Sequence, residues 1–228
     1  MAYVQNSFSI DPFISNAYKE KRRQLIDSLR ARPELSAEVL DAMEQLPREL
    51  FVSPAFINRT YEDSALPIDC SQTISQPYTV AYMTTVLDAK PMDRILEIGT
   101  GSGYQAALLY LLGARVFTIE RHEKLHLQSK NLFAKLKMNI QTRHGDGTLG
   151  WREFSPYQGI ITTAAAPQAP RPLLEQLSIG GKLVIPIGDK DVQTMHIIER
   201  TGANDWRERK TDAFKFVPLI GREGWGQK

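Results

Sequence analysis

The chain has 228 residues, which is enough to bury one sizeable core with or without a small additional lobe. Its 28 basic and 26 acidic residues nearly balance, which excludes the strong field expected of a protein that binds nucleic acid or a membrane surface. Cys70 is the only cysteine, so an internal disulfide is excluded and a reducing, cytoplasmic location is favoured.

The first ninety residues are predicted to be helical around one long irregular segment. Residues 1–17 show no clear period. Apolar positions at helical spacing predict three helices, over residues 18–29, between Ser36 and Pro47, and from Pro77 to Leu87. Residues 48–74 have few periodic positions, and long irregular segments of this kind are often functional. We therefore expect residues 1–90 to form a lid or adaptor in front of the following domain.

From Asp93 onward the predicted elements alternate between strands and helices. Strands are expected at residues 94–98, 115–120, 139–144, 159–164, 182–187, 192–198 and 213–218, and helices at 103–112, 123–137 and 171–177. Alternation followed by closely spaced strands is typical of a mostly parallel sheet with an antiparallel edge. The sequence thus predicts a Rossmann-like α/β domain over residues 91–228, packed with residues 1–90 as one unit. Ligands of such sheets bind at the carboxyl ends of the strands.

Residues 95–103, Ile-Leu-Glu-Ile-Gly-Thr-Gly-Ser-Gly, carry the strongest chemical signal. A strand runs into three glycines, which permit positive φ and a close ligand approach. Their spacing differs from the dinucleotide pattern, and Glu97 would repel a pyrophosphate. A carboxylate there suits the ammonium and sulfonium of S-adenosylmethionine, and Glu120 ends the next strand, where an acid accepts ribose hydroxyls. A turn whose glycines only pack helix on sheet would leave both strand-end carboxylates unexplained.

Two further segments indicate what accepts the methyl group. Residues 162–167, Thr-Thr-Ala-Ala-Ala-Pro, offer no acid, amide or aromatic side chain beside the expected donor. Such a wall favours an acceptor that is already anionic at pH 7, and a carboxylate is the obvious candidate. Ser75 has two interpretations, because it precedes the helix that begins at Pro77. It is either a plain cap of that helix or a contact for an anion at the helix N-terminus.

Several motifs extend this chemistry over most of the chain. They are Leu66-Pro67-Ile68, Gln72-Thr73-Ile74-Ser75-Gln76-Pro77, residues 96–107, Gly145-Asp146-Gly147, Gly150-Trp151, residues 163–167, Gln176-Leu177, residues 180–188 and Phe216-Val217-Pro218-Leu219. Together they resemble the protein-L-isoaspartate O-methyltransferase family over roughly residues 20–221. The Thr-Ile-Ser-Gln-Pro element is specific to that family rather than to methyltransferases at large.

The resemblance implies a class I S-adenosylmethionine-dependent methyltransferase fold and a repair reaction. The enzyme would methylate the free α-carboxylate of L-isoaspartyl residues in damaged peptides and proteins, and the ester would then collapse to a succinimide. Ser75 matches the active-site serine that hydrogen-bonds the acceptor. The implied cofactor-binding residues are Gln72, Thr73, Ile74, Ser75, Glu97, Gly99, Thr100, Gly101, Ser102, Gly103, Glu120, Asp146 and Gly147. The implied substrate contacts are Ile68, Ser75, Ala165 and Val217.

One departure from the family pattern keeps alternatives open. Asp69-Cys70-Ser71 stands where members usually have Gly-x-Gly, and Asp69 adds a negative charge to the substrate loop. A tailoring carboxyl methyltransferase with a dedicated peptide or small-molecule substrate is one alternative, and a non-catalytic S-adenosylmethionine-binding module is another. The expected partners are isoaspartyl peptides and proteins, not nucleic acid or membranes. The scattered histidines and the cysteine predict no metal site, and the sequence does not indicate the oligomeric state.

Overall fold

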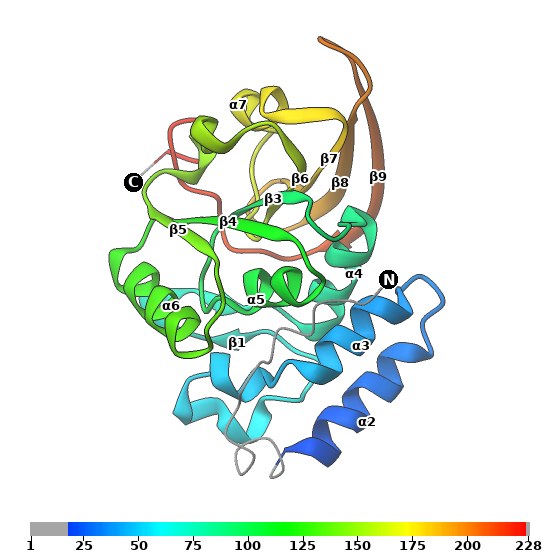
Figure 1. The fold of residues 1–228 in the computed structure, drawn as a ribbon, viewed down its shortest axis with the longest axis vertical. Coiled ribbons are helices and arrows are strands. Elements are labelled where there is room, and N and C mark those ends of the chain that lie inside the picture. Colours follow the sequence, from blue (N-terminus) through cyan, green and yellow to red (C-terminus); the bar gives the residue numbers. More distant parts are fainter. Residues whose placement is uncertain (1–17, 227–228) are drawn as a thin grey trace.

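The computed structural model describes residues 18–226, so the expectation for residues 1–17 lies outside the described part. Helices (α), 3-10 helices (η) and strands (β) lead from an N-terminal helical region into a twisted sheet (Figure 1). In chain order they are α2 (Lys19–Arg30), α3 (Ala37–Gln45), η1 (Arg48–Phe51), η2 (Pro54–Arg59), β1 (Leu66–Pro67), η3 (Asp69–Ser71), β2 (Thr73–Ile74), α4 (Pro77–Leu87), β3 (Arg94–Ile98), α5 (Tyr104–Leu111), β4 (Arg115–Glu120), α6 (Glu123–Lys135), β5 (Gln141–His144), η4 (Gly147–Leu149), η5 (Arg152–Phe154), β6 (Tyr157–Thr162), α7 (Arg171–Glu175), β7 (Leu177–Gly188), β8 (Gln193–Arg200) and β9 (Trp206–Phe214).

Within residues 18–226, seven strands form one sheet in the order β5-β4-β3-β6-β7-β8-β9. The pairs from β5 to β7 are parallel, and β8 and β9 are added antiparallel at one edge. The expected mostly parallel sheet with an antiparallel edge is confirmed. The chain builds outward from β3 to β5 and then returns to place β6 on the other side of β3. A ligand site is therefore expected at the carboxyl ends of β3 and β6, where the strand order reverses.

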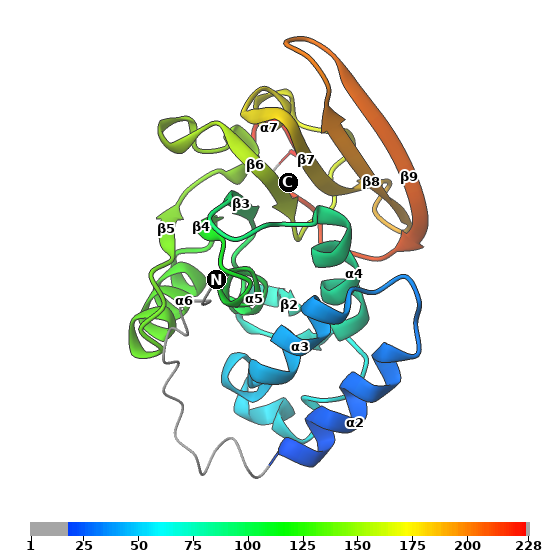
Figure 2. The same ribbon diagram turned by 45° about the vertical axis from the view of Figure 1, so that its right-hand side comes forward.

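Both faces of the sheet are covered by apolar cores. Since successive residues of a strand point to opposite sides, each strand contributes side chains to both cores. Ile95 and Val116 belong to the core shared with helices α4 and α5, whereas Leu96 and Phe117 belong to a second core that includes Leu173 of α7. Figure 2 shows α4 and α5 on one side of the sheet and α7 on the other. Within the described part of the chain, no helix combines the length and the apolarity needed to cross a membrane.

The N-terminal helices extend the first core rather than forming a separate one. Leu29 of α2 and Leu40 of α3 are 1% and 2% exposed and belong to the same apolar cluster as Ile161 and Val184 of the sheet. Helix α3 also contacts α4 and α5. Residues on both sides of position 90, where we expected the two regions to meet, therefore share one apolar core. The division into 1–90 and 91–228 stays a prediction about chain organisation. The irregular segment 48–74 contains η1, η2, η3 and the two-stranded β1–β2 sheet.

Helix α4 begins at Pro77 as expected, but Ser75 does not cap it. Gln76 occupies the cap position, and no side chain at that position bonds to the helix. The backbone N–H of Tyr78 instead donates to Asp63 Oδ1 at 2.8 Å. A carboxylate at a helix N-terminus satisfies a free N–H and interacts favourably with the helix dipole. The cap interpretation of Ser75 is therefore wrong, and the Ser75 hydroxyl is left for another partner.

The prediction of a strand over residues 213–218 is also wrong, because the last strand lies earlier in the chain. Strand β9 covers Trp206–Phe214, and Pro218 forms only an isolated bridge with Ala165. Most of β9 is exposed at the edge of the sheet, so its residues lack the apolar alternation by which a strand is recognised. Two smaller differences concern α7, which ends at Glu175, and β7, which begins at Leu177 rather than at residue 182.

Candidate functional site

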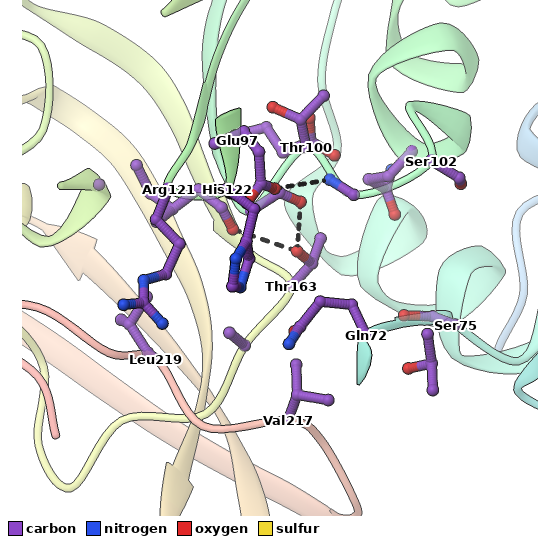
Figure 3. Close-up of a pocket in the computed structure, with 18 of the residues that line it drawn as sticks. Gln72, Ser75, Glu97, Thr100, Ser102, Arg121, His122, Thr163, Val217 and Leu219 are labelled. Carbon is purple, nitrogen blue, oxygen red and sulfur yellow. Dashed lines mark hydrogen bonds between the residues drawn. The ribbon is translucent and has the colours of Figure 1, made fainter. Parts of the chain in front are cut away.

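A cavity opens at the carboxyl ends of β3, β4 and β6, where the strand order reverses. In Figure 3, Glu97 and Thr100 enter it from the sheet side, Gln72 and Ser75 from the segment before α4, Val217 from below and Leu219 from the left. The lining residues are Gln72, Thr73, Ile74, Ser75, Val80, Glu97, Ile98, Gly99, Thr100, Gly101, Ser102, Tyr104, Gln105, Ile119, Glu120, Arg121, His122, Gly147, Thr163, Ala164, Val217, Pro218, Leu219 and Ile220. Six separate parts of the chain thus meet at one site.

The turn after β3 requires glycine for two different reasons. Gly99 has φ +94°, and a Cβ there would lie 2.5 Å from Thr163 Oγ1. Thr163 Oγ1 itself donates to the carbonyl of Gly99 at 2.6 Å, so this close approach joins β3 to the segment after β6. Gly103 has φ +91°, and a Cβ there would lie 2.7 Å from the Phe133 ring of α6. The glycines therefore let the turn bend tightly while helix packing and cavity walls come close to its backbone.

Glu97 is a fully buried carboxyl group at the end of β3. Its Oε2 accepts a hydrogen bond from Thr118 Oγ1, while its Oε1 has no hydrogen-bond partner within the described part of the chain. Burial raises the pKa of Glu97 to about 8; the hydrogen bond from Thr118 and a backbone contact with Ala106 oppose the rise, and the nearby Glu120 carboxylate adds to it. A buried acceptor without a partner, at the wall of a cavity, fits a ligand that brings a cationic donor such as an ammonium group.

Glu120 ends β4 and lines the same cavity. Its Oε2 accepts from the backbone N–H of Gly101 and its Oε1 from the backbone N–H of His122, both at 2.9 Å. These two bonds fix the orientation of the carboxylate, and each oxygen keeps a further lone pair for a ligand donor. The geometry suits a pair of neighbouring hydroxyl groups, such as those of a ribose.

Ser75 lies between β2 and α4 and is held through its backbone. Arg48 Nη2 donates to the carbonyl of Ser75 at 2.8 Å, and Arg48 Nε donates to the carbonyl of Thr60 at 3.1 Å. Arg48 is only 1% exposed, so these bonds fix the segment from inside the protein. The Ser75 hydroxyl has no hydrogen-bond partner among residues 18–226 and faces the cavity, where it can donate to a ligand.

The wall opposite Ser75 combines the segment after β6 with a later part of the chain. Thr163 and Ala164 line the cavity, and Ala165 lies just behind them. The N–H of Ala165 donates to the carbonyl of Val217 at 2.8 Å, and the N–H of Leu219 donates to the carbonyl of Ala165 at 2.7 Å. Residues 217–220 are therefore held against residues 163–165 and complete a wall without an ionisable side chain. That wall matches the uncharged surface expected beside an anionic acceptor.

The structure brings most of the expected site residues to this cavity. Among them, the lining includes Gln72, Thr73, Ile74, Ser75, Glu97, Gly99, Thr100, Gly101, Ser102, Glu120, Gly147 and Val217. Ile68, Gly103, Asp146 and Ala165 lie outside the lining. Gly103 and Ala165 support residues that line it, and Ile68 instead lines a second cavity beside α6. The individual contacts of these residues with ligands stay predictions.

Asp146 occupies a position that the sequence did not indicate. Its Oδ1 accepts from the N–H of Thr148 at 2.9 Å, and its Oδ2 accepts from the N–H of Arg222 at 2.8 Å. Burial alone would raise the pKa of Asp146, but the hydrogen bonds from Arg222 and Thr148 lower it below its usual range. The carboxylate thus holds the segment after residue 220 beside η4, and its expected contact with the cofactor stays a prediction.

Sequence reasoning missed part of the lining. Val80, Tyr104 and Gln105 lie on the buried faces of α4 and α5, where an apolar or core role was the simpler interpretation. Arg121 and His122 follow Glu120 directly, so their position next to a strand-end acid was the available signal. Leu219 belongs to the Phe216–Leu219 motif, which did not indicate a place in the cavity, and Ile220 lies outside any motif.

Comparison with known proteins gives a consistent assignment. The profile of the family described as protein-L-isoaspartate(D-aspartate) O-methyltransferase matches residues 20–224. A protein-L-isoaspartate O-methyltransferase of Salinibacter ruber is 46% identical over 225 residues, which cover 94% of this chain and 98% of the relative. One of Chlorobium limicola is 50% identical over 207 residues, which cover 90% of this chain and 95% of the relative.

Solved structures agree with the fold. A protein-L-isoaspartate O-methyltransferase structure superposes with a TM-score of 0.82 at 27% identity, covering 89% of this chain and 67% of that one. A Plasmodium falciparum protein described as a beta-aspartate methyltransferase, solved in complex with S-adenosyl-L-homocysteine, gives a TM-score of 0.76 at 24% identity. That alignment covers 87% of this chain and 98% of the other. The expected Rossmann-like class I methyltransferase fold is confirmed.

Proposed function

The chain belongs to the protein-L-isoaspartate O-methyltransferase family, and on that premise we propose that it transfers a methyl group from S-adenosylmethionine to the free α-carboxylate of L-isoaspartyl residues in peptides and proteins. The observation that carries the proposal is the pairing of two groups in one cavity. Within the described residues, Glu97 offers a buried carboxylate oxygen without a hydrogen-bond partner, and Ser75, whose backbone carbonyl is bound by Arg48, contributes a hydroxyl-bearing side chain to the cavity. The first suits a cationic donor molecule, and the second suits an anionic acceptor.

The residues around the turn after β3 fit the methyl donor. Glu97 is placed to accept from the ammonium of its methionine part, and Glu120 is placed to accept from the ribose hydroxyls. Gly147 also lines the cavity, and a Cβ there would lie 2.4 Å from Ile98 Cγ2, so the close packing of this segment on β3 requires glycine. When bound, S-adenosylmethionine supplies an electrophilic methyl group on a sulfonium centre.

The residues around Ser75 fit the acceptor. A peptide α-carboxylate is ionised at pH 7, so the protein has no proton to remove before transfer. Ser75 donates a hydrogen bond that orients the carboxylate, and Val217 and Ala164 present uncharged surface beside it. Methyl transfer is an in-line displacement, for which positioning and exclusion of water are the main contributions of a protein. The chain supplies both without a general base.

The wider role follows from the product. A methyl ester on an isoaspartyl residue is activated for attack by the neighbouring backbone nitrogen, which releases methanol and closes a succinimide. Hydrolysis of the succinimide partly restores a normal aspartyl link, so the reaction initiates repair of damaged proteins. We place this activity in the cytoplasm, in line with the single cysteine. The Asp69 charge, which had favoured a dedicated substrate, is paired with Lys124 at 2.9 Å and does not line the cavity.

The test uses labelled S-adenosylmethionine and two peptides that differ only in an isoaspartyl or an aspartyl link. We expect base-labile label on the isoaspartyl peptide alone. Ser75→Ala should lower kcat/KM for that peptide about 10- to 100-fold, because a hydrogen bond to a charged group is lost, while affinity for S-adenosylhomocysteine changes less than about threefold. Ser28→Ala, at an exposed serine of α2 that does not line the cavity, is the control. Transfer to neither peptide would refute the proposal, and equal transfer to both would refute the isoaspartyl specificity.

A further inference from the structure

The side chain of Asp69, in the short η3 turn, is bound by two residues of helix α6. Lys124 Nζ lies 2.9 Å from Asp69 Oδ1, and Gln128 Nε2 donates to Asp69 Oδ2 at 2.8 Å. Lys124 and Gln128 are four residues apart, so they lie on the same face of α6. The hydrogen bond from Gln128 and the interaction with Lys124 both lower the pKa of Asp69. Both oxygens of one carboxylate thus join η3 to α6.

The turn that follows Asp69 has an unfavourable backbone. Cys70 and Ser71 have φ values of +58° and +55°, in the left-handed region that side chains with a Cβ rarely adopt. Two hydrogen bonds tie Gln72 to this turn. Its N–H donates to the carbonyl of Asp69 at 3.2 Å, and its Nε2 donates to the carbonyl of Cys70 at 3.1 Å. The conformation of η3 therefore sets the position of Gln72, where the cavity lining begins.

The η3 turn also borders a second cavity beside α6, whose lining includes Ile68, Asp69 and Gln128. The same cavity reaches Gly101 and Ser102 of the turn after β3, so the two cavities meet at that turn. Within residues 18–226, the ion pair and the hydrogen bond of Asp69 are side-chain contacts that join η3 to α6 across the rim of this cavity. Helix α6 in turn begins just after Glu120 and His122, which line the candidate site from its other side.

We propose that Asp69 is a positioning residue whose contacts with Lys124 and Gln128 hold Gln72–Ser75 over the cavity and slow the release of S-adenosylmethionine and S-adenosylhomocysteine. The proposal rests on the proposed function only for the identity of the ligand. Lys124 and Asp69 are 60% and 42% exposed, so dissolved salt screens their attraction. Ligand release should therefore become faster as ionic strength rises, and only while both partners are present.

The competing interpretation is an ordinary surface ion pair without functional effect, which is common for exposed charges. The two interpretations differ in what they predict for release of the ligand. A surface pair affects neither the dissociation rate nor its dependence on salt. A contact that positions the lining must change the dissociation rate in any variant that breaks it. Removing the second partner as well must then leave the dissociation rate unchanged.

The experiment measures the dissociation rate of S-adenosylhomocysteine from the full chain by stopped-flow displacement. Asp69→Asn and Lys124→Met should each raise the rate about three- to fivefold, a range set by the modest coupling of exposed charge pairs. The double variant should be no faster than either single one. Lys130→Met, which removes another exposed lysine of α6, is the matched control and should stay within about 1.5-fold of the wild type. Raising NaCl to about 0.5 M should accelerate release from the wild type and leave Asp69→Asn unchanged.

A kinetic readout separates this role from a merely structural one. KM for S-adenosylmethionine should rise in Asp69→Asn, while KM for the isoaspartyl peptide stays constant, and the charge exchange Asp69→Lys with Lys124→Asp should recover part of the loss. Dissociation rates within twofold of the wild type for both single variants would overturn this inference and leave the proposed function intact. The same holds if Lys130→Met raises the dissociation rate as much as they do. If the wild type binds no S-adenosylhomocysteine, the proposed function and this inference both fail.

Discussion

Ionisation of the buried Glu97 carboxyl is expected to couple ligand binding to the release of a proton. Its pKa is raised to about 8, so at neutral pH most molecules without ligand carry a protonated Glu97. A cationic group that binds at the unpartnered Oε1 favours the ionised form. Binding must then expel the proton, and the free energy of doing so weakens binding at low pH. Affinity should rise with pH and level off above about pH 8.

The magnitude follows from the fraction of ionised Glu97. With a pKa of about 8, that fraction is roughly 1 in 100 at pH 6.0 and roughly 1 in 4 at pH 7.5. If only the ionised form binds, the Kd for S-adenosylhomocysteine falls about 25-fold over this interval. Close to one proton should leave for each ligand bound at pH 6.5. Glu97→Gln preserves the shape of the side chain but cannot ionise, so it should bind weakly without this pH dependence.

Isothermal titration calorimetry at several pH values, in buffers with different ionisation enthalpies, measures both the Kd and the number of protons released. His122 also lines the cavity and is unchanged in Glu97→Gln, so this variant serves as the control for other titrating groups. A wild-type Kd that differs by less than twofold between pH 6.0 and 7.5 would refute the reasoning. So would an equal slope in Glu97→Gln.

Three further predictions concern stability and the shape of the site. Gly99→Ala places a Cβ 2.5 Å from Thr163 Oγ1 at φ +94°. Calorimetry should therefore show that the free energy of unfolding falls by about 2–4 kcal/mol, and titration should show weaker ligand binding. An unchanged Tm would contradict the assigned turn. Arg48→Met removes two hydrogen-bond donors to the backbone carbonyls of Thr60 and Ser75. In urea unfolding it should lower the free energy of unfolding by about 2–4 kcal/mol, which is more than Arg48→Lys lowers it. Asp63→Ala removes the acceptor of the Tyr78 N–H and should cost about 1 kcal/mol; no change would mean that the exposed contact does not stabilise α4.

The sequence predicted those elements of the fold whose apolar residues recur at a regular spacing. The strands at 94–98 and 115–120 match β3 and β4, and the helix at 123–137 overlaps α6 closely. These elements are buried on one or both faces, so burial leaves a period in the sequence. Strand β9 has no such period, because it pairs only with β8 at the edge of the sheet and exposes most of its charged residues. Its assignment depends on hydrogen bonds to another strand, which no local pattern records.

The same distinction separates the predicted and the missed parts of the site. The turn at residues 95–103 is a continuous motif, so its glycines and Glu97 could be recognised together. The support around it joins residues that are far apart in the chain, such as Arg222 with Asp146, which are separated by 76 positions. Arg48 and Asp63 likewise reach the segment around Ser75 from outside any motif. Which charged residue lies beneath a loop depends on the folded path of the chain, and no local pattern in a single sequence records that path.

The wall formed by residues 217–220 follows the entire sheet in the order of synthesis, since β9 ends at Phe214. The seven-stranded sheet therefore does not include this wall. We expect a chain truncated after Phe214 to retain the sheet and to bind the ligand weakly, because one side of the pocket is then missing.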